Sequence, residues 1–416
     1  MLARAREHSG ALFLIVSTTV ANVLAYGYQV LQARLLRPEE YAALTALFGI
    51  LILESVSSQV IQSATATLTA RYRARDEQDA LHAFVRRWSV RIGGGAAVLG
   101  FVVLLLSPFI ASALSLPPVS VALLGLTLFL ALVFTFALGL LQGLARFVWM
   151  GSALIAQAGT RLAVGVALVA LVGLGVDGAF TGAMAAIAVS LVVAAIPLLP
   201  LVRAARGSTV AIELGAAETR FFVLSAVILL AYAALTNVDA VLARSILSPE
   251  QAGAYAGAIT MGKIVLFAPI AIGFLLLERT ARAHAKGEDT ERMLFLAFGF
   301  VVMTSGAVAL AYVLAPEFLV PLVVGSQYPE TTKIVGIYGI AALANALLNL
   351  WIAYFIGRGE MRIGLLLALA VAAELGLLLL TVTDAVAMAR TVLIVALATQ
   401  AAAGATFMFV RKRSPL

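Results

Sequence analysis

The chain of 416 residues contains no cysteine, and only 12% of its residues are charged. The absence of cysteine excludes disulfide bonds and thiol chemistry, although it leaves the cellular compartment open. The low charge excludes an ordinary soluble domain, in which about a quarter of the residues are charged. No stretch resembles a nucleotide-binding loop, a metal-binding cluster or a nucleophile paired with a base. Nothing in the sequence indicates a cofactor, a metal or an enzyme active site.

Hydrophobic residues make up 62% of the chain, and the mean hydropathy is +1.06. A helix that crosses a bilayer core needs about 20 mostly apolar residues. The sequence therefore predicts an all-α polytopic membrane protein, with no connection long enough for a soluble domain. The twelve predicted transmembrane helices are residues 9–35, 40–70, 89–113, 118–143, 150–173, 178–202, 220–246, 252–279, 292–315, 333–357, 360–383 and 385–410.

Lysine and arginine are unevenly divided between alternate loops. Of the 28 in the chain, five fall on one predicted side, namely Arg34, Arg37, Arg244, Lys333 and Arg390. Two more lie inside spans, and the remaining 21 share the side of both termini. Because basic loops stay in the cytoplasm, both termini are predicted to be cytoplasmic in a cell (inner) membrane protein. The net charge of +7 then reflects topology, and no nucleic-acid partner is expected.

Parts of the sequence occur twice. Residues 35–49 align with residues 246–260 at an offset of 211, with Pro-Glu in both. Two further anchors, one at the ends of the third and ninth spans and one after the fourth and tenth, have offsets of 208 and about 213. This indicates duplication of a six-helix unit, with an N-lobe at 1–206 and a C-lobe at 207–416. Because six is even, the lobes share one orientation, and the substrate site is expected between them.

Polar residues recur at helical spacing on the repeat-equivalent spans one and seven, and two and eight. They are Thr19, Asn22, Tyr26 and Gln29; Glu54, Ser55, Ser58, Gln59, Gln62, Thr65 and Thr69; Ser225, Tyr232, Thr236 and Asp239; and Thr260 and Lys263. Such residues either hold helices together by hydrogen bonds or line a water-filled path. For the second span we favour the path. Asn22, Gln29, Gln59 and Gln62 are the candidate substrate contacts among the uncharged residues.

Charged residues inside the spans are a stronger signal. A charge at mid-membrane costs about 2.5–3.5 kcal/mol on insertion scales and usually faces a cavity or a partner. Glu54 and Lys263 occupy nearly equivalent places in the two repeats, so a salt bridge between lobes is the structural alternative to a role in transport. Arg161 likewise corresponds to Glu374 in the repeat.

Asp239 lies in the seventh span and has no acidic counterpart, because the equivalent residue is Tyr28. The symmetry of a duplicated scaffold does not account for it. Its structural alternative is a carboxylate that packs between helices.

Three motifs together suggest a family. They are ARLL-x-PEEY at residues 33–41, LSPE-x-AGAY at residues 247–255 after Asp239, and AP followed by GSQY at residues 315–328. Over essentially the whole chain this pattern resembles the polysaccharide-biosynthesis branch, the Wzx-type flippases, of the multidrug/oligosaccharidyl-lipid/polysaccharide (MOP) exporter superfamily.

The resemblance implies a V-shaped exporter of two six-helix lobes. It would move an undecaprenyl-pyrophosphate-linked oligosaccharide between leaflets by alternating access, with membrane lipids around it and H⁺ or Na⁺ as coupling ion. Under this hypothesis Lys263 and Arg161 receive the pyrophosphate. Asp239, Glu54 and Glu374 are the candidate ion-coupling carboxylates.

Other functions stay open. A cation/drug antiporter of the same superfamily would depend on Asp239 and Glu54, whereas Lys263 would be awkward for a cationic substrate. Flippases of peptidoglycan precursors usually have fourteen spans, and no extra pair is found. A membrane glycan polymerase or ligase would be expected to have a large outer loop, and the longest outer connection, residues 316–333, is too short. The Asp-Arg motif of major-facilitator transporters is missing between spans two and three.

Overall fold

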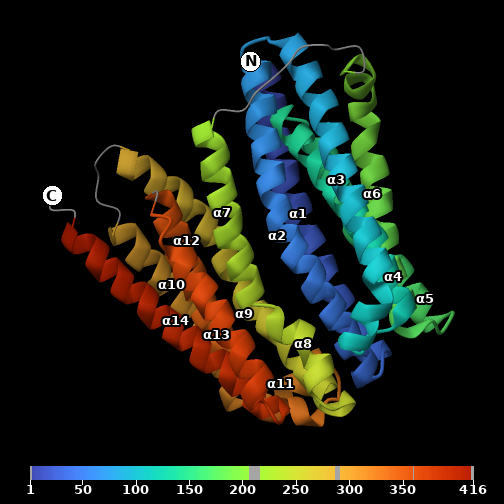
Figure 1. Ribbon diagram of the computed structural model, residues 1–416, viewed down its shortest axis with the longest axis vertical. Helices are drawn as coiled ribbons and strands as arrows, with labels where there is room; N and C mark the ends of the chain where they lie inside the picture. Colours follow the sequence, from blue (N-terminus) through green and yellow to red (C-terminus); the bar gives the residue numbers. More distant parts are fainter. Residues whose placement is uncertain (1, 206–215, 286–290, 359, 414–416) are drawn as a thin grey trace. The chain divides into compact units, whose positions relative to one another are not determined.

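The computed structural model describes residues 2–205, 216–285, 291–358 and 360–413. Within these ranges the chain forms helices joined by short turns and contains no β-strand (Figure 1). Eleven helical segments of the described residues are long and apolar enough to cross a membrane. The predicted all-α polytopic architecture is confirmed.

The helices follow one another with few intervening residues. The first half of the chain forms α1 (Leu2–Leu35), α2 (Pro38–Ala74), α3 (Gln78–Ala113), α4 (Pro118–Gly143), α5 (Phe147–Ala170) and α6 (Gly175–Ala205). The second half forms α7 (Ala216–Leu235), α8 (Val238–Ile246), α9 (Pro249–Ala285), α10 (Glu291–Leu314), α11 (Pro316–Val323), the 3₁₀ turn η1 (Pro329–Lys333), α12 (Val335–Gly357), α13 (Ile363–Thr381) and α14 (Ala385–Arg413).

The seventh predicted span differs from the expectation. Instead of one helix over 220–246, the chain forms α7 and α8 with a break at Thr236 and Asn237. The outer connection 316–333 also contains two short helical segments, α11 and η1. The eighth predicted span lies in α9, part of which falls outside the residues whose side chains are described.

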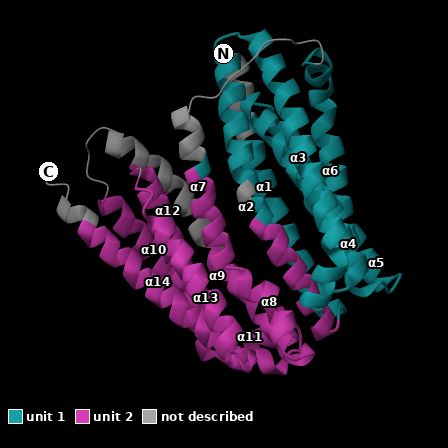
Figure 2. Ribbon diagram, in the orientation of Figure 1, with its two compact units in different colours: residues 1–36, 54–223 teal, residues 37–53, 224–416 magenta. Residues whose placement is uncertain are grey.

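The helices group into two compact units (Figure 2). Unit 1 comprises residues 1–36 and 54–223, and unit 2 comprises residues 37–53 and 224–416. The N-terminal half of α2 therefore belongs to unit 2, where Gly253 of α9 packs directly on Pro38. The predicted lobe boundary at residue 206 lies outside the described residues.

The duplicated turns begin helices in the same way. Proline stands at the first position of both α2 and α9, where its missing N–H leaves no hydrogen bond unmade. In the first turn the Arg37 N–H donates to Glu40 Oε2 at 3.1 Å, and in the second the Gln251 N–H donates to Ser248 Oγ at 3.4 Å. Each turn thus forms one half of a capping box.

Within each unit, helices with equivalent places in the repeat pack on one another in the same order. In unit 1, α3 packs on α4, α4 on α6, and α5 on α6 and on α1. In unit 2, α10 packs on α12, α12 on α14, and α13 on α14 and on α8. This shared order agrees with the duplication predicted from the sequence.

Close helix approach in unit 1 depends on small residues of α4. A Cβ atom at Gly139 would lie 2.7 Å from Cβ of Thr65, and one at Gly143 would lie 2.5 Å from Cβ of Thr69. Both threonines belong to α2, so the missing side chains of these glycines allow α2 to lie directly against α4. Such contacts are the usual means of helix association in a membrane, where the lipid is as apolar as the side chains.

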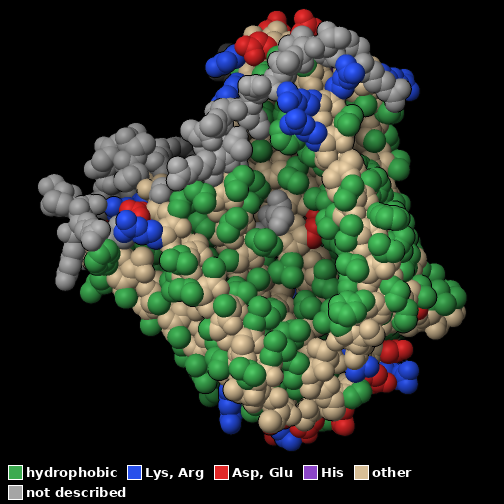
Figure 3. All heavy atoms as spheres, viewed as in Figure 1, with side chains coloured by type: hydrophobic (Ala, Val, Ile, Leu, Met, Phe, Trp, Pro, Cys, Tyr) green, Lys and Arg blue, Asp and Glu red, His purple; other side chains and the backbone are tan. Residues whose placement is uncertain are grey.

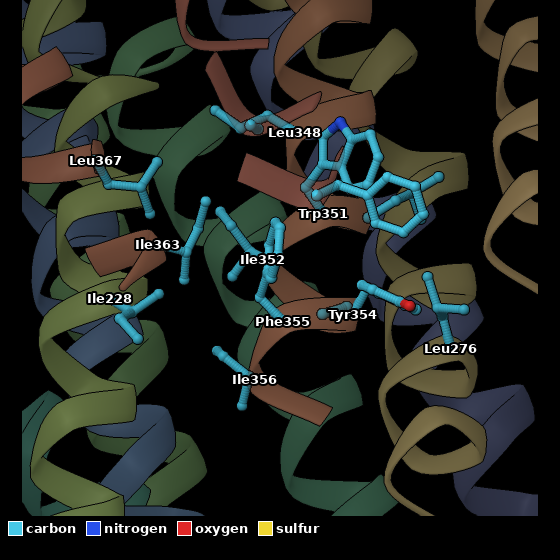
Figure 4. Close-up of a cluster of buried hydrophobic side chains, with 14 of the residues drawn as sticks. Ile228, Leu276, Leu348, Trp351, Ile352, Tyr354, Phe355, Ile356, Ile363 and Leu367 are labelled. Carbon is cyan, nitrogen blue, oxygen red and sulfur yellow. The ribbon is translucent and has the colours of Figure 1, made fainter. Parts of the chain in front are cut away.

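The core of unit 2 is built around α12. Of the eleven candidate spans, the one that contains α12 is the most enclosed, with 78% of an apolar 18-residue stretch buried. Figure 4 shows Ile352 beside Ile363 of α13, and Tyr354 directed toward Leu276 of α9. Figure 3 shows hydrophobic side chains over the middle of each unit, with most of the visible Lys, Arg, Asp and Glu near the helix ends, as expected in a bilayer.

Candidate functional site

The break between α7 and α8 places Asp239 in the first turn of a new helix. Thr236 Oγ1 and Asn237 Nδ2 donate to the carbonyls of Tyr232 and Ala233, each at 3.0 Å, and so complete the end of α7. Asn237 then serves as the residue before α8. A helix N-terminus carries partial positive charge, which favours a carboxylate there.

Two tyrosines surround the Asp239 carboxylate, which is 1% exposed. The hydroxyl of Tyr255 on α9 donates to Asp239 Oδ2 at 2.8 Å. The hydroxyl of Tyr338 on α12 lies next to the same carboxylate. The two rings meet edge to face, with centroids 5.6 Å apart. Side chains from α9 and α12 thus fix the position of this carboxylate of α8.

A second buried carboxylate lies close by. Glu374 of α13 is also 1% exposed, and it is near enough to Asp239 for the two charges to interact. Among the described residues, Asp239 Oδ1 and Glu374 Oε1 are buried without a hydrogen-bond partner. We call Asp239, Glu374, Tyr255 and Tyr338 the carboxylate site.

Such a pair is costly unless something neutralises it. An ionised carboxylate taken out of water costs several kcal/mol without a partner, and a second negative charge adds repulsion. A proton or a small cation removes this cost, and oxygen atoms are the ligands that hard cations prefer. The described residues contain no group of three or more His, Cys, Asp or Glu that could hold a metal ion, so the arrangement is that of a carboxylate pair with hydroxyl neighbours.

Arg161, predicted as a substrate contact, lies on α5 in unit 1. Its guanidinium carbon is 5.0 Å from the ring centroid of Tyr28 on α1, which is a cation–π distance. The Tyr28 side chain is 0% exposed, and its hydroxyl donates to the carbonyl of Ala179 on α6 at 2.8 Å. Arg161 and Tyr28 are therefore in contact. In the repeat, Arg161 corresponds to Glu374 and Tyr28 corresponds to Asp239.

The predicted uncharged substrate contacts lie on α1 and α2. Asn22 and Gln59 are exposed, and Gln29 and Gln62 are half-buried. Gln62 Nε2 donates to Gln142 Oε1 of α4 at 3.0 Å, so this residue links two helices. Substrate binding by all four stays a prediction.

Glu54 and Lys263 belong to different units. Glu54, half-buried in α2, accepts a hydrogen bond from Ser58 one turn later. Lys263 is half-buried in α9. Their pairing, and the roles predicted for them, stay predictions.

Sequence reasoning missed Tyr338 and the helix break. Asn237 carried a signal, because asparagine is a preferred residue before a helix and stands two positions ahead of Asp239. The apolar pattern runs through this position without interruption and conceals the break. Tyr338 carries no local signal, since only the packing of α12 on α9 brings it to Asp239.

No protein-family model matches the chain, and no curated protein matches it in sequence. Solved structures do match in fold. A multidrug resistance MATE family transporter of the MOP superfamily, in its inward-facing conformation, is similar over 96% of both chains, with a TM-score of 0.76 and 13% identity. A MATE transporter from Vibrio cholerae is similar over 98% of both chains, with a TM-score of 0.66 and 17% identity.

The lipid II flippase MurJ, in an inward closed conformation, is also similar. The match covers 95% of this chain and 87% of that chain, with a TM-score of 0.69 and 11% identity. At these identities the likeness establishes the fold. The chain has the fold of MOP superfamily transporters, as the sequence motifs predicted.

Proposed function

We propose that this protein is an exporter that flips an undecaprenyl-pyrophosphate-linked oligosaccharide across the cell (inner) membrane, driven by an H⁺ or Na⁺ gradient. The observation that carries the coupling is the buried pair of Asp239 and Glu374, each with one oxygen that lacks a hydrogen-bond partner in the described chain. The likeness in fold to transporters that include a lipid II flippase supports transport. The Wzx-type motifs support the substrate.

The coupling ion binds at the carboxylate site. Without it, two buried negative charges repel each other, and with it they are drawn together through the shared proton or cation. Because Asp239 stands at the α7–α8 break and Glu374 on α13, ion binding favours the arrangement in which these elements are close. A ligand shifts a conformational equilibrium only by its differential affinity for the two states, and this pair supplies such a difference.

The substrate is bound elsewhere. Lys263 contacts the pyrophosphate, the polar residues of α1 and α2 pass the sugars, and Glu54 tunes Lys263. The prenyl chain stays in lipid, which avoids the cost of enclosing it in a polar path. Both termini lie in the cytoplasm.

Complementation of a flippase-null strain tests both parts. Asp239→Asn and Lys263→Ala are each expected to reduce glycan export by more than about tenfold, since 1.36 kcal/mol of lost stabilisation is one factor of ten. Glu330→Gln is the matched control, because it removes an exposed carboxylate whose ion pair with Lys333 is worth about 0–1 kcal/mol. Wild-type export by Asp239→Asn, at normal expression, would refute the coupling site. Wild-type export by Lys263→Ala, at normal expression, would refute the substrate site.

Antiport of a cationic drug is the second candidate, because the structures similar in fold include MATE transporters, one of them a multidrug resistance transporter. Efflux of a cationic dye from membrane vesicles distinguishes the two. The flippase hypothesis predicts no efflux above that of empty vesicles, whereas gradient-driven efflux that Asp239→Asn abolishes would favour the antiporter.

A further inference from the structure

The two halves of the chain fill equivalent positions with opposite chemistry. Tyr28 precedes Asp239 by the repeat offset of 211, and Arg161 precedes Glu374 by 213. The helices that carry them correspond as well, since α1 packs on α5 and α8 packs on α13. Where unit 2 places two carboxylates, unit 1 places a phenol and a guanidinium.

The guanidinium is held at a defined place. Its carbon lies 5.0 Å from the Tyr28 ring centroid, and it is also close enough to hydrogen-bond the Tyr28 hydroxyl. The ring itself is fixed by the hydrogen bond to the Ala179 carbonyl and by Gly165, where a Cβ atom would lie only 2.7 Å from Tyr28 Cε2. The pocket therefore suits a flat cation stacked on an aromatic ring.

The amide of Gln32 adds a polar neighbour. Gln32 is 0% exposed and lies one turn after Tyr28, beside the Tyr28 hydroxyl. A neutral hydrophobic side chain at position 161 would leave the Tyr28 hydroxyl and the Gln32 amide without a charged neighbour. A cation there is stabilised by the ring.

We propose that Arg161 is a built-in cation. Its guanidinium permanently occupies a position in the N-terminal half that is equivalent to the position of the coupling ion in the C-terminal half. The comparison of the halves rests on the proposed coupling site at Asp239 and Glu374. It follows that α1, α5 and α6 keep the ion-bound arrangement throughout the cycle. Only the C-terminal half responds to the ion gradient, and one coupling site operates per transporter. Arg161 is thus a positioning residue.

Chemical rescue tests this role on the purified full chain. Thermal unfolding is followed by tryptophan fluorescence, for which the chain has three tryptophans. Arg161→Ala is expected to lower the unfolding midpoint. Methylguanidinium chloride at millimolar concentration and constant ionic strength is expected to raise it again, saturably, in this variant and not in the wild type. N-methylurea, which is neutral and similar in shape, is expected to have no effect.

Two results would directly overturn the proposal: an unchanged unfolding midpoint in Arg161→Ala, or no recovery of the midpoint with methylguanidinium. Equal recovery with N-methylurea would also overturn it, because it would show that the site requires a molecule of this size and not a positive charge. If Arg161→Ala does not fold, Arg161→Lys and Arg161→Met replace it. Arg161→Lys is expected to keep more of the wild-type midpoint than Arg161→Met, and equal midpoints would contradict a requirement for charge.

The two proposals fail separately. Adding Asp239→Asn to Arg161→Ala is expected to leave the response to methylguanidinium unchanged, because the pocket belongs to unit 1. Wild-type export by Asp239→Asn would refute the coupling site and leave the rescue intact. Loss of the rescue alone would refute the built-in cation.

Discussion

Asp239 and Asp384 are both aspartates at the start of a helix in unit 2, yet their carboxylates have different surroundings. Asp384 precedes α14 at the surface, and its Oδ1 accepts hydrogen bonds from the N–H groups of Val386 and Ala387 at 2.9 and 2.8 Å. Asp239 is buried, and its Oδ2 accepts a hydrogen bond from the Tyr255 hydroxyl at 2.8 Å. The first is a helix cap, and the second is held by tyrosine hydroxyls inside unit 2.

The cap at Asp384 predicts a dependence of stability on pH. The N–H groups of Ala387 and Val386 hold the pKa of the Asp384 carboxyl below its ordinary value. A carboxyl whose pKa is lower in the folded state stabilises the fold above its unfolded pKa of about 3.9, and this contribution is lost as the pH falls through the folded value. Asp384→Ala is expected to cost about 0.5–2 kcal/mol at neutral pH.

Unfolding midpoints measured at neutral and acidic pH check this expectation. The difference between wild type and Asp384→Ala should shrink as the carboxyl is protonated. Asp384→Asn, which keeps a capping oxygen, should lie near the wild type at neutral pH. A difference that is constant down to pH values well below the folded pKa would contradict the cap.

At the scale of the helix, the contact between α2 and α4 predicts which glycines tolerate a side chain. Gly143→Ala would place a Cβ atom 2.6 Å from the carbonyl oxygen of Ala66, and α2 cannot move away without losing its other contacts. Overpacking of this kind costs about 1–3 kcal/mol. Gly159→Ala is the matched control on α5, because its Cβ would have no neighbour within 4 Å.

The measurement is the unfolding midpoint of each purified variant. Gly159→Ala should equal or exceed the wild type, since alanine favours a helix over glycine by about 1 kcal/mol. Equal midpoints for the two variants would show that α2 and α4 are not in direct contact.

The break between α7 and α8 is the second feature at this scale. Replacing Asn237 with leucine removes the donor to the Ala233 carbonyl and favours one continuous helix. Asn237→Leu is therefore expected to reduce transport as Asp239→Asn does, whereas Asn237→Asp, which retains a residue suited to the start of a helix, should keep more activity. Export in the flippase-null strain is the readout, and full activity of Asn237→Leu would mean that the break has no role.

The sequence predicted helices whose signals are local. Pro38 and Pro249 mark helix starts through their own chemistry. The apolar runs locate the helices but not all of their ends, since α3 begins at Gln78 whereas the third span is predicted to begin at residue 89. The meeting of Asp239 with Tyr255, Tyr338 and Glu374 could not be predicted, because it requires the packing of α8, α9, α12 and α13 in three dimensions. The repeat in the sequence relates Asp239 to Tyr28 and Glu374 to Arg161, but it does not show which of these residues are close in space.

For the whole molecule, the distribution of basic residues predicts the orientation in the membrane, and the absence of cysteine makes it simple to measure. Glu77→Cys lies in the exposed turn between α2 and α3, and Lys333→Cys lies at the exposed end of η1. With intact cells, a membrane-impermeant maleimide should label Lys333→Cys at once and Glu77→Cys only after permeabilisation. The reverse pattern would place both termini outside.

The central claim is that an ion at the carboxylate site drives the movement of a lipid-linked oligosaccharide. The most direct test is translocation of that lipid in proteoliposomes, with an H⁺ or Na⁺ gradient imposed in separate runs. The wild type should move the lipid faster with one of the two gradients than without it, and Asp239→Asn should lose this acceleration. Movement that is independent of both gradients, or an acceleration that Asp239→Asn retains, would contradict the account.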